Sequence, residues 1–133
     1  MTCRLTEIVV DCHDPVLLAG FWCQVLDYHV LRTEDDQVEI GPWQREPSDL
    51  ADQIRSAPTP PTLVFVIVPE DKAVKNRLHL DVRPVDRTHE EEVDRVVGLG
   101  ARPADVGQGA VPWRVLADPE GNEFCVLGPL PPG

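Results

Sequence analysis

The order of predicted elements repeats once along the chain, and this repeat restricts the folds that the chain can adopt. In each half a strand is followed by a helix and then by three more strands. A single helix covers one face of a sheet, so the uncovered faces must be buried against each other or around a ligand. The pattern therefore predicts an α+β fold in which two βαβββ modules form a curved mixed sheet around a cavity.

The first module is predicted at about residues 4–68. Asp14 suits the N-cap of its helix and Pro15 the first helical position, and apolar residues at helical spacing continue to near Asp27. A variable loop rich in proline, about residues 42–61, is either a lid over the cavity or a surface insertion. The strands of this module are predicted at residues 5–11, 28–32, 37–40 and 63–68.

The second module is predicted at about residues 76–128, and the two modules together form one domain, residues 1–133. Thr88 and Glu91 form a capping box at the start of its helix, which Gly100 ends. Asp118-Pro119-Glu120-Gly121 has the composition of a type I turn, so we assign it no chemistry. The strands of this module are predicted at residues 78–82, 102–106, 113–117 and 123–127.

The charge of the chain restricts its partners. With 23 acidic and 12 basic residues, its formal net charge is −11, which repels nucleic acid and anionic membrane surfaces. There is no apolar run of spanning length, no signal peptide and no C-x-x-C pair, which predicts a reduced, cytoplasmic protein. We expect Cys3, Cys12 and Cys23 to be small buried side chains.

A row of polar residues marks the most informative strand. Period-two alternation over residues 76–83 places His79 and Asp81 on one face, together with Arg77 and Arg83. If the apolar face of this strand lies under the helix, His79 points into the cavity. The basic residues near this strand either hold an anionic substrate or pair with neighbouring carboxylates, and we expect pairing for Lys72, Lys75 and Arg77.

Three side chains on three strands form a candidate metal site. The same alternation identifies three candidate ligands: the carboxylate of Glu7, the imidazole of His79 and the thiol of Cys125. Together they suit a divalent metal of unknown identity. The alternative is that no metal binds: His79 then pairs with Asp81 or a backbone carbonyl, Glu7 is solvated and Cys125 packs in the core. We interpret His13, His29 and His89 as surface residues.

Several stretches of the sequence resemble a known family. Residues 68–72 (VPEDK), 75–81 (KNRLHLD) and 117–127 (ADPEGNEFCVL), with Phe21-Trp22 in the first helix, are similar to glyoxalase-like proteins of the vicinal-oxygen-chelate (glyoxalase/bleomycin resistance/dioxygenase) superfamily. The resemblance covers nearly the whole chain apart from residues 42–61. It implies the fold that the element order predicts.

The resemblance also implies where a metal would bind. Metal-dependent members take ligands from the first, fourth, fifth and eighth strands, usually histidine or glutamate. These positions correspond here to Glu7, a position at or beside Val66, His79 and Cys125. Because Val66 cannot ligate a metal and Cys125 replaces the usual glutamate, the pattern disfavours a glyoxalase I reaction. The absence of a second histidine ligand disfavours extradiol dioxygenase chemistry.

Two kinds of function follow from these observations. One is a divalent-metal-dependent lyase that acts on a small molecule, with its catalytic residues unassigned. The other is a metal-free protein of the bleomycin-resistance type that binds a small aromatic or cationic molecule through Trp113, Asp81 and Trp43. For Trp113 the alternative is packing in the core. The resemblance further implies a homodimer.

Overall fold

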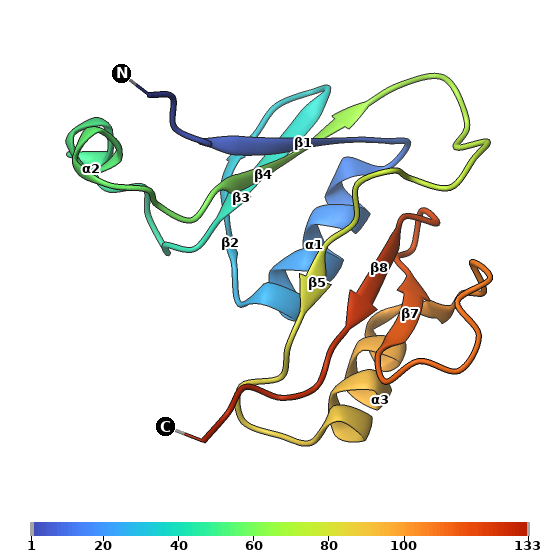
Figure 1. Cartoon of the computed structure of the whole chain (residues 1–133). Helices are drawn as coiled ribbons and strands as arrows, with labels where there is room; N and C mark the ends of the chain where they lie inside the picture. Colours follow the sequence, from blue (N-terminus) through green and yellow to red (C-terminus); the bar gives the residue numbers. More distant parts are fainter. Residues whose placement is uncertain (1, 133) are drawn as a thin grey trace. The chain divides into compact units, whose positions relative to one another are not determined.

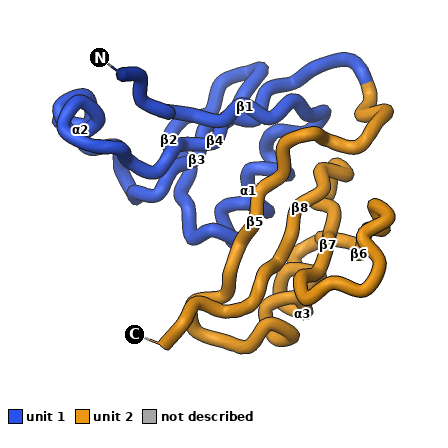
Figure 2. The backbone as a smooth tube through the Cα atoms, viewed as in Figure 1, with its two compact units in different colours: residues 1–70 blue, residues 71–133 orange. Residues whose placement is uncertain are grey.

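The computed structural model describes residues 2–132, and the chain divides into two compact units (Figure 2). The first unit ends at Glu70 and the second begins at Asp71. The first contains β1 (Glu7–Cys12), α1 (Pro15–Leu26), β2 (His29–Thr33), β3 (Gln37–Gly41), α2 (Leu50–Ser56) and β4 (Thr62–Ile67). The second contains β5 (Asp81–Val82), α3 (His89–Leu99), β6 (Arg102–Pro103), β7 (Arg114–Ala117) and β8 (Glu123–Val126).

Each unit contains one four-stranded mixed sheet, and the two sheets have the same strand order. The order is β1-β4-β3-β2 in the first unit and β5-β8-β7-β6 in the second. In both, the first strand of the unit pairs in parallel with its last strand, and the remaining neighbours are antiparallel. This shared order confirms the predicted α+β fold and the repeat of βαβββ modules.

In the first unit, α1 covers one face of the sheet (Figure 1). The Asp14 side chain accepts a hydrogen bond from Leu17 N (3.1 Å), and Pro15 follows it as predicted, so the helix starts where the sequence indicates. The apolar stripe of α1 is buried with the inner residues of β3 and β4. The fully or nearly fully buried residues include Leu18, Phe21, Trp22, Ile40 and Phe65.

The predicted variable loop contains α2 and is fastened to the first unit at several points. Arg4 Nε donates to Ile54 O (2.8 Å), and the Tyr28 hydroxyl donates to Pro61 O (3.0 Å). Arg32 bonds Glu46 (2.8 Å). These contacts join the segment to residues before β1 and within or beside β2.

In the second unit, α3 begins with the predicted capping box and covers the inner face of β7 and β8. Thr88 Oγ1 accepts from Glu91 N (3.2 Å), and Glu91 Oε1 accepts from Thr88 N (3.0 Å). Gly100 ends the helix with a φ of 127°, a value that glycine tolerates well. The core between helix and sheet contains Val93, Val96, Leu116, Phe124 and Val126.

The predicted strand at 78–82 is the clearest correction, because only Asp81 and Val82 are in β5. Leu78 is 90% exposed. The backbone ladder with β8 stops at the bond from Cys125 N to Leu80 O (3.0 Å), and Asn76 N bonds the Glu123 side chain instead of a backbone carbonyl. A side-chain contact thus replaces the strand pairing that the alternation had suggested. The predicted strand at 102–106 is likewise shorter, Arg102–Pro103.

Two side-chain predictions are also wrong. His89 is not a solvated surface residue: it is half-buried, and its Nε2 lies 3.0 Å from Val126 O. Cys3 is exposed, whereas Cys12 is buried as predicted. No helix within residues 2–132 is long and apolar enough to cross a membrane.

Candidate metal site of the second unit

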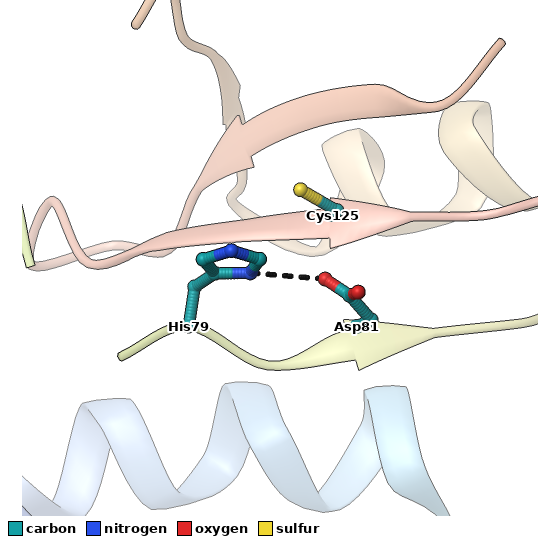
Figure 3. A group of neighbouring side chains, drawn as sticks. All are labelled: His79, Asp81 and Cys125. Carbon is teal, nitrogen blue, oxygen red and sulfur yellow. Dashed lines mark hydrogen bonds and ion pairs between the residues drawn. The ribbon is translucent and has the colours of Figure 1, made fainter. Parts of the chain in front are cut away.

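Three potential metal ligands lie together where β5 pairs with β8. The parallel register places Asp81 directly beside Cys125, and His79 precedes Asp81 by two residues and lies on the same side of the chain. One ligand atom from each of the three residues lies within 4.8 Å of the others. Figure 3 shows His79 and Asp81 on one segment and Cys125 on the neighbouring strand. The site therefore offers one nitrogen, one oxygen and one sulfur donor.

His79 and Asp81 already contact each other. His79 Nδ1 lies 2.9 Å from Asp81 Oδ1, which is the pairing that the metal-free alternative anticipates (Figure 3). Because a carboxylate only accepts hydrogen bonds, this contact favours the tautomer with the proton on Nδ1. Among residues 2–132, Nε2 of His79 has no hydrogen-bond partner. The contact thus leaves Nε2 available to a metal or a substrate.

Cys125 is buried, with 7% of its surface exposed, and its surroundings favour the neutral thiol. Burial is the main cause that raises the pKa of Cys125, followed by the negative charge of Asp81 and hydrogen bonding to it. The positive charge of Lys75 acts in the opposite direction. As a neutral thiol, Cys125 is a poor nucleophile, and a bound metal would shift it to the thiolate.

A pocket of about 620 Å³ in the second unit contains this group in its wall. His79, Asp81 and Cys125 line it, and Trp113 lines it as well. Trp113 is 39% exposed, so it is not the core residue that the alternative interpretation assumed. The pocket therefore combines polar groups with an aromatic surface, as small-molecule sites do.

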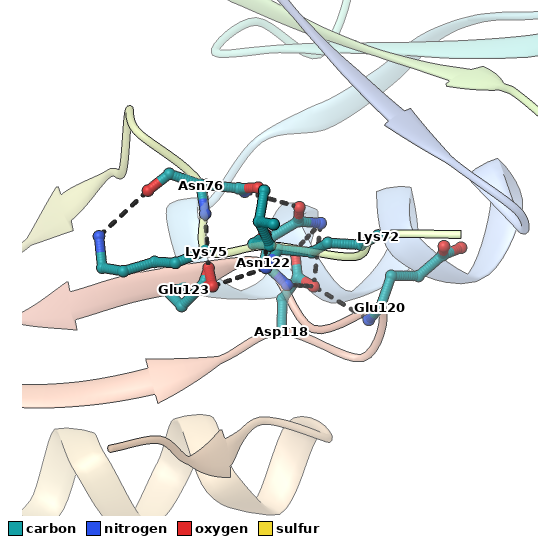
Figure 4. A network of polar contacts seen from close by, with 8 residues as sticks. Lys72, Lys75, Asn76, Asp118, Glu120, Asn122 and Glu123 are labelled. Carbon is teal, nitrogen blue, oxygen red and sulfur yellow. Dashed lines mark hydrogen bonds and ion pairs between the residues drawn. The ribbon is translucent and has the colours of Figure 1, made fainter. Parts of the chain in front are cut away.

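A network of hydrogen bonds holds the turn before β8 (Figure 4). Asp118 is fully buried, and its Oδ1 accepts from the backbone N–H of Glu120 (2.9 Å) and of Asn122 (3.0 Å). The Asn122 side chain also donates to Asp118 and accepts from Asn76 Nδ2 (2.9 Å). The predicted turn is confirmed by the bond from Gly121 N to Asp118 O (2.8 Å). Asp118 therefore stabilises the turn, in line with the expectation that the turn carries no chemistry.

Glu123, which follows this turn, is held by Lys72. Lys72 Nζ lies 2.6 Å from Glu123 Oε1, and Asn76 N donates to Oε2 (3.2 Å). Burial raises the pKa of Glu123, but the hydrogen bond from Lys72 and further hydrogen bonds outweigh it, so the net pKa is lowered. Glu123 is therefore an ion-paired carboxylate at the pocket.

The remaining predicted residues lie in the first unit. Glu7 is exposed on β1, and the next residue, Ile8, is more buried, as expected for side chains on opposite faces of a strand. Val66 lies beside Asp11 in the ladder and offers no ligand atom. Trp43 is half-buried beside Gly41. Glu7 as a metal ligand and Trp43 as a ligand-binding residue stay predictions from the sequence, whereas His79, Asp81, Cys125 and Trp113 line one pocket.

Two basic residues of the pocket were not singled out as site residues from the sequence. Lys75 and Arg83 line the pocket, although pairing with neighbouring carboxylates was expected for Lys75. The alternation placed Arg83 on the same face as His79 and Asp81, and Lys75, four residues before His79, continues that row. Their partners, which decide their role, could not be read from that pattern.

Comparisons with known proteins show the fold of the chain and its family. The fold matches a glyoxalase/bleomycin resistance protein/dioxygenase family enzyme from Burkholderia phytofirmans with a TM-score of 0.63 at 15% identity, over 93% of this chain and 97% of that one. It matches the fosfomycin resistance protein FosX from Mesorhizobium loti with a TM-score of 0.62 at 12% identity, over 96% and 92%. The chain thus has the fold of the vicinal-oxygen-chelate superfamily.

The family itself follows from the sequence. Residues 7–127 match the model of the glyoxalase-like domain, so the chain belongs to the glyoxalase-like domain family. A FosX variant from Listeria monocytogenes, solved with Mn(II) and 1S,2S-dihydroxypropylphosphonic acid, matches with a TM-score of 0.62 at 12% identity over 98% of this chain and 93% of that one. No curated protein sequence matches the chain.

Proposed function

We propose that this protein is an enzyme for a small molecule, and that its reaction depends on a divalent metal held by His79, Asp81 and Cys125. The observation that carries the proposal is the convergence of three different ligand atoms within 4.8 Å in the wall of a pocket. Clusters of this kind in a pocket are the usual starting point for assigning a catalytic site.

The donor set fits a metal such as zinc. Zinc bonds of about 2.0–2.3 Å in a tetrahedral centre keep neighbouring ligand atoms roughly 3.5 Å apart. The three donors here lie within 4.8 Å of one another, so binding requires the side chains to move to that spacing. Three protein ligands leave a fourth position open, which is typical of catalytic zinc sites and not of structural ones. Imidazole and thiolate donors favour zinc over magnesium or calcium.

The metal and the residues of the pocket have different proposed roles. A bound divalent metal supplies a Lewis acid that polarises an oxygen of the substrate or of water. In the protein without metal, the 2.9 Å contact between Asp81 and His79 Nδ1 holds both side chains at the wall of the pocket. Trp113 provides an aromatic surface for the apolar part of the substrate.

The Listeria FosX structure supports this proposal, because a protein of the same fold there holds both Mn(II) and a small organic molecule. At 12% identity it supports the kind of site only, and not a substrate or a metal for this chain.

A metal-free binding protein is the second candidate. The observation that favours it is that Asp81 is already satisfied by His79, while Cys125 remains a buried thiol with a raised pKa. In that case the pocket binds its ligand mainly through Trp113 and the polar groups around it.

Metal analysis separates the two candidates. The protein is purified without chelator or affinity metal, incubated separately with zinc, manganese, nickel and iron(II), and freed of excess metal before elemental analysis. We expect close to one equivalent per chain of at least one metal. If none of the four is retained, the metal proposal is wrong and the binding protein is favoured.

A further inference from the structure

The acidic and the basic residues of the pocket differ in whether they have partners. Lys75 and Arg83 supply two positive charges to its wall, and Asp81 and Glu123 supply two negative ones. Glu123 is neutralised by Lys72, which lies 2.6 Å away, and Asp81 is bonded to His79. The acidic residues of the pocket thus have partners within the second unit.

The two cations have no such partners. Lys75 Nζ donates to Asn76 O (3.1 Å), and Arg83 Nη1 donates to Gly128 O (3.0 Å). Within residues 2–132, neither side chain forms an ion pair, although the chain carries 23 acidic residues. The wall of the pocket therefore presents two cations that have no carboxylate partner among the described residues.

Lys75 lines the same pocket as the three residues of the candidate metal site. The indole N–H of Trp113 also has no partner within residues 2–132, although it belongs to a residue of the pocket wall. The pocket therefore presents free donors and an aromatic face but no free carboxylate.

We propose that the molecule bound in this pocket is an organic anion, a carboxylate or phosphonate with an apolar body, whose acid group is held by Lys75. Arg83 attracts the same ligand from the other end of the polar row, and Trp113 contacts its apolar part. This inference rests on the proposed function in using the same pocket, but it does not require the metal. It replaces the cationic ligand that the net charge suggested with an anionic one.

A matched pair of probes tests the sign of the ligand charge. Phenylacetate and 2-phenylethylamine share an aromatic ring and differ in charge, and each is titrated into the chelator-treated protein. Binding is followed by the Trp113 indole resonance in ¹H–¹⁵N spectra, assigned with a Trp113→Phe variant. We expect a saturable shift with phenylacetate and none with the amine at equal concentration. Equal or stronger binding of the amine would overturn the proposal.

Two variants test the role of Lys75. Lys75→Met should weaken phenylacetate binding about ten-fold, the size expected for one lost charge-assisted hydrogen bond. Arg77→Met is the matched control, since Arg77 is an exposed cation on the same segment that does not line the pocket. It should leave the affinity unchanged. Equal effects of the two substitutions would show that Lys75 has no specific contact with the anion.

The same titration separates this inference from the metal proposal. Phenylacetate should bind the chelator-treated protein. Its affinity for the metal-loaded protein should be equal or somewhat higher. Binding only in the presence of metal would assign the anion to the metal and not to Lys75. Retention of metal without any anion binding would leave the proposed function standing and remove only the inference.

Discussion

Replacement of His79 by alanine should lower the affinity for a divalent metal about a hundred-fold or more. The imidazole is one of only three donors in the candidate site, and loss of a residue that merely orients a ligand already costs about 10–100-fold. The fold should persist, because the His79–Asp81 contact lies at the surface, with side chains 41% and 44% exposed. Calorimetric metal titration and thermal unfolding of the same sample measure both quantities.

His29→Ala is the control for this experiment. His29 lies at the start of β2 in the first unit and is not part of the candidate site. This variant should bind metal as the unmodified protein does. Equal affinity in His79→Ala and His29→Ala would remove His79 from the site.

Replacement of Asp118 by alanine should reduce the free energy of unfolding by about 3 kcal/mol, since it leaves several donors without an acceptor in the interior. Asp118 is fully buried and accepts from two backbone N–H groups and from the Asn122 side chain. Urea unfolding followed by circular dichroism provides the measurement. Asp105→Ala is a suitable control, because exposed Asp105 accepts a single local bond from Gly107 N (2.8 Å).

We expect the control to lose less than about 1 kcal/mol. Equal losses in the two variants would mean that the buried network in Figure 4 does not stabilise the turn. Because this turn leads directly into Glu123 and Cys125, the Asp118 variant should also weaken metal binding, whereas the Asp105 variant should not.

The fold was predictable because local signals agree with its overall pattern. The Asp14–Pro15 start of α1 and the Thr88–Glu91 capping box of α3 depend on neighbouring residues only, and both are present as predicted. Strand length was less predictable. β5 is shorter than its alternation suggests because a strand needs a partner, and at Asn76 the partner is a side chain of β8.

The candidate site was partly predictable from the alternation of side chains along one segment. Alternation identifies side chains that share a face, so it selected His79 and Asp81 for one wall. Pairing between charges, in contrast, depends on which distant groups the fold brings close. Lys72 and Lys75 are three residues apart, yet only Lys72 reaches Glu123, which is about fifty positions further along the chain. No pattern in the sequence distinguishes the two lysines.

The cobalt(II) spectrum of the protein tests the central claim most directly, because it reports the ligand atoms themselves. Cobalt(II) replaces zinc in many sites, and bonding to a thiolate produces an intense charge-transfer band in the near ultraviolet. The account predicts this band in the unmodified protein and in Cys3→Ser, whose substituted residue is exposed, and its loss in Cys125→Ser. A spectrum without the band, or one that Cys125→Ser leaves unchanged, would contradict a metal site at His79, Asp81 and Cys125.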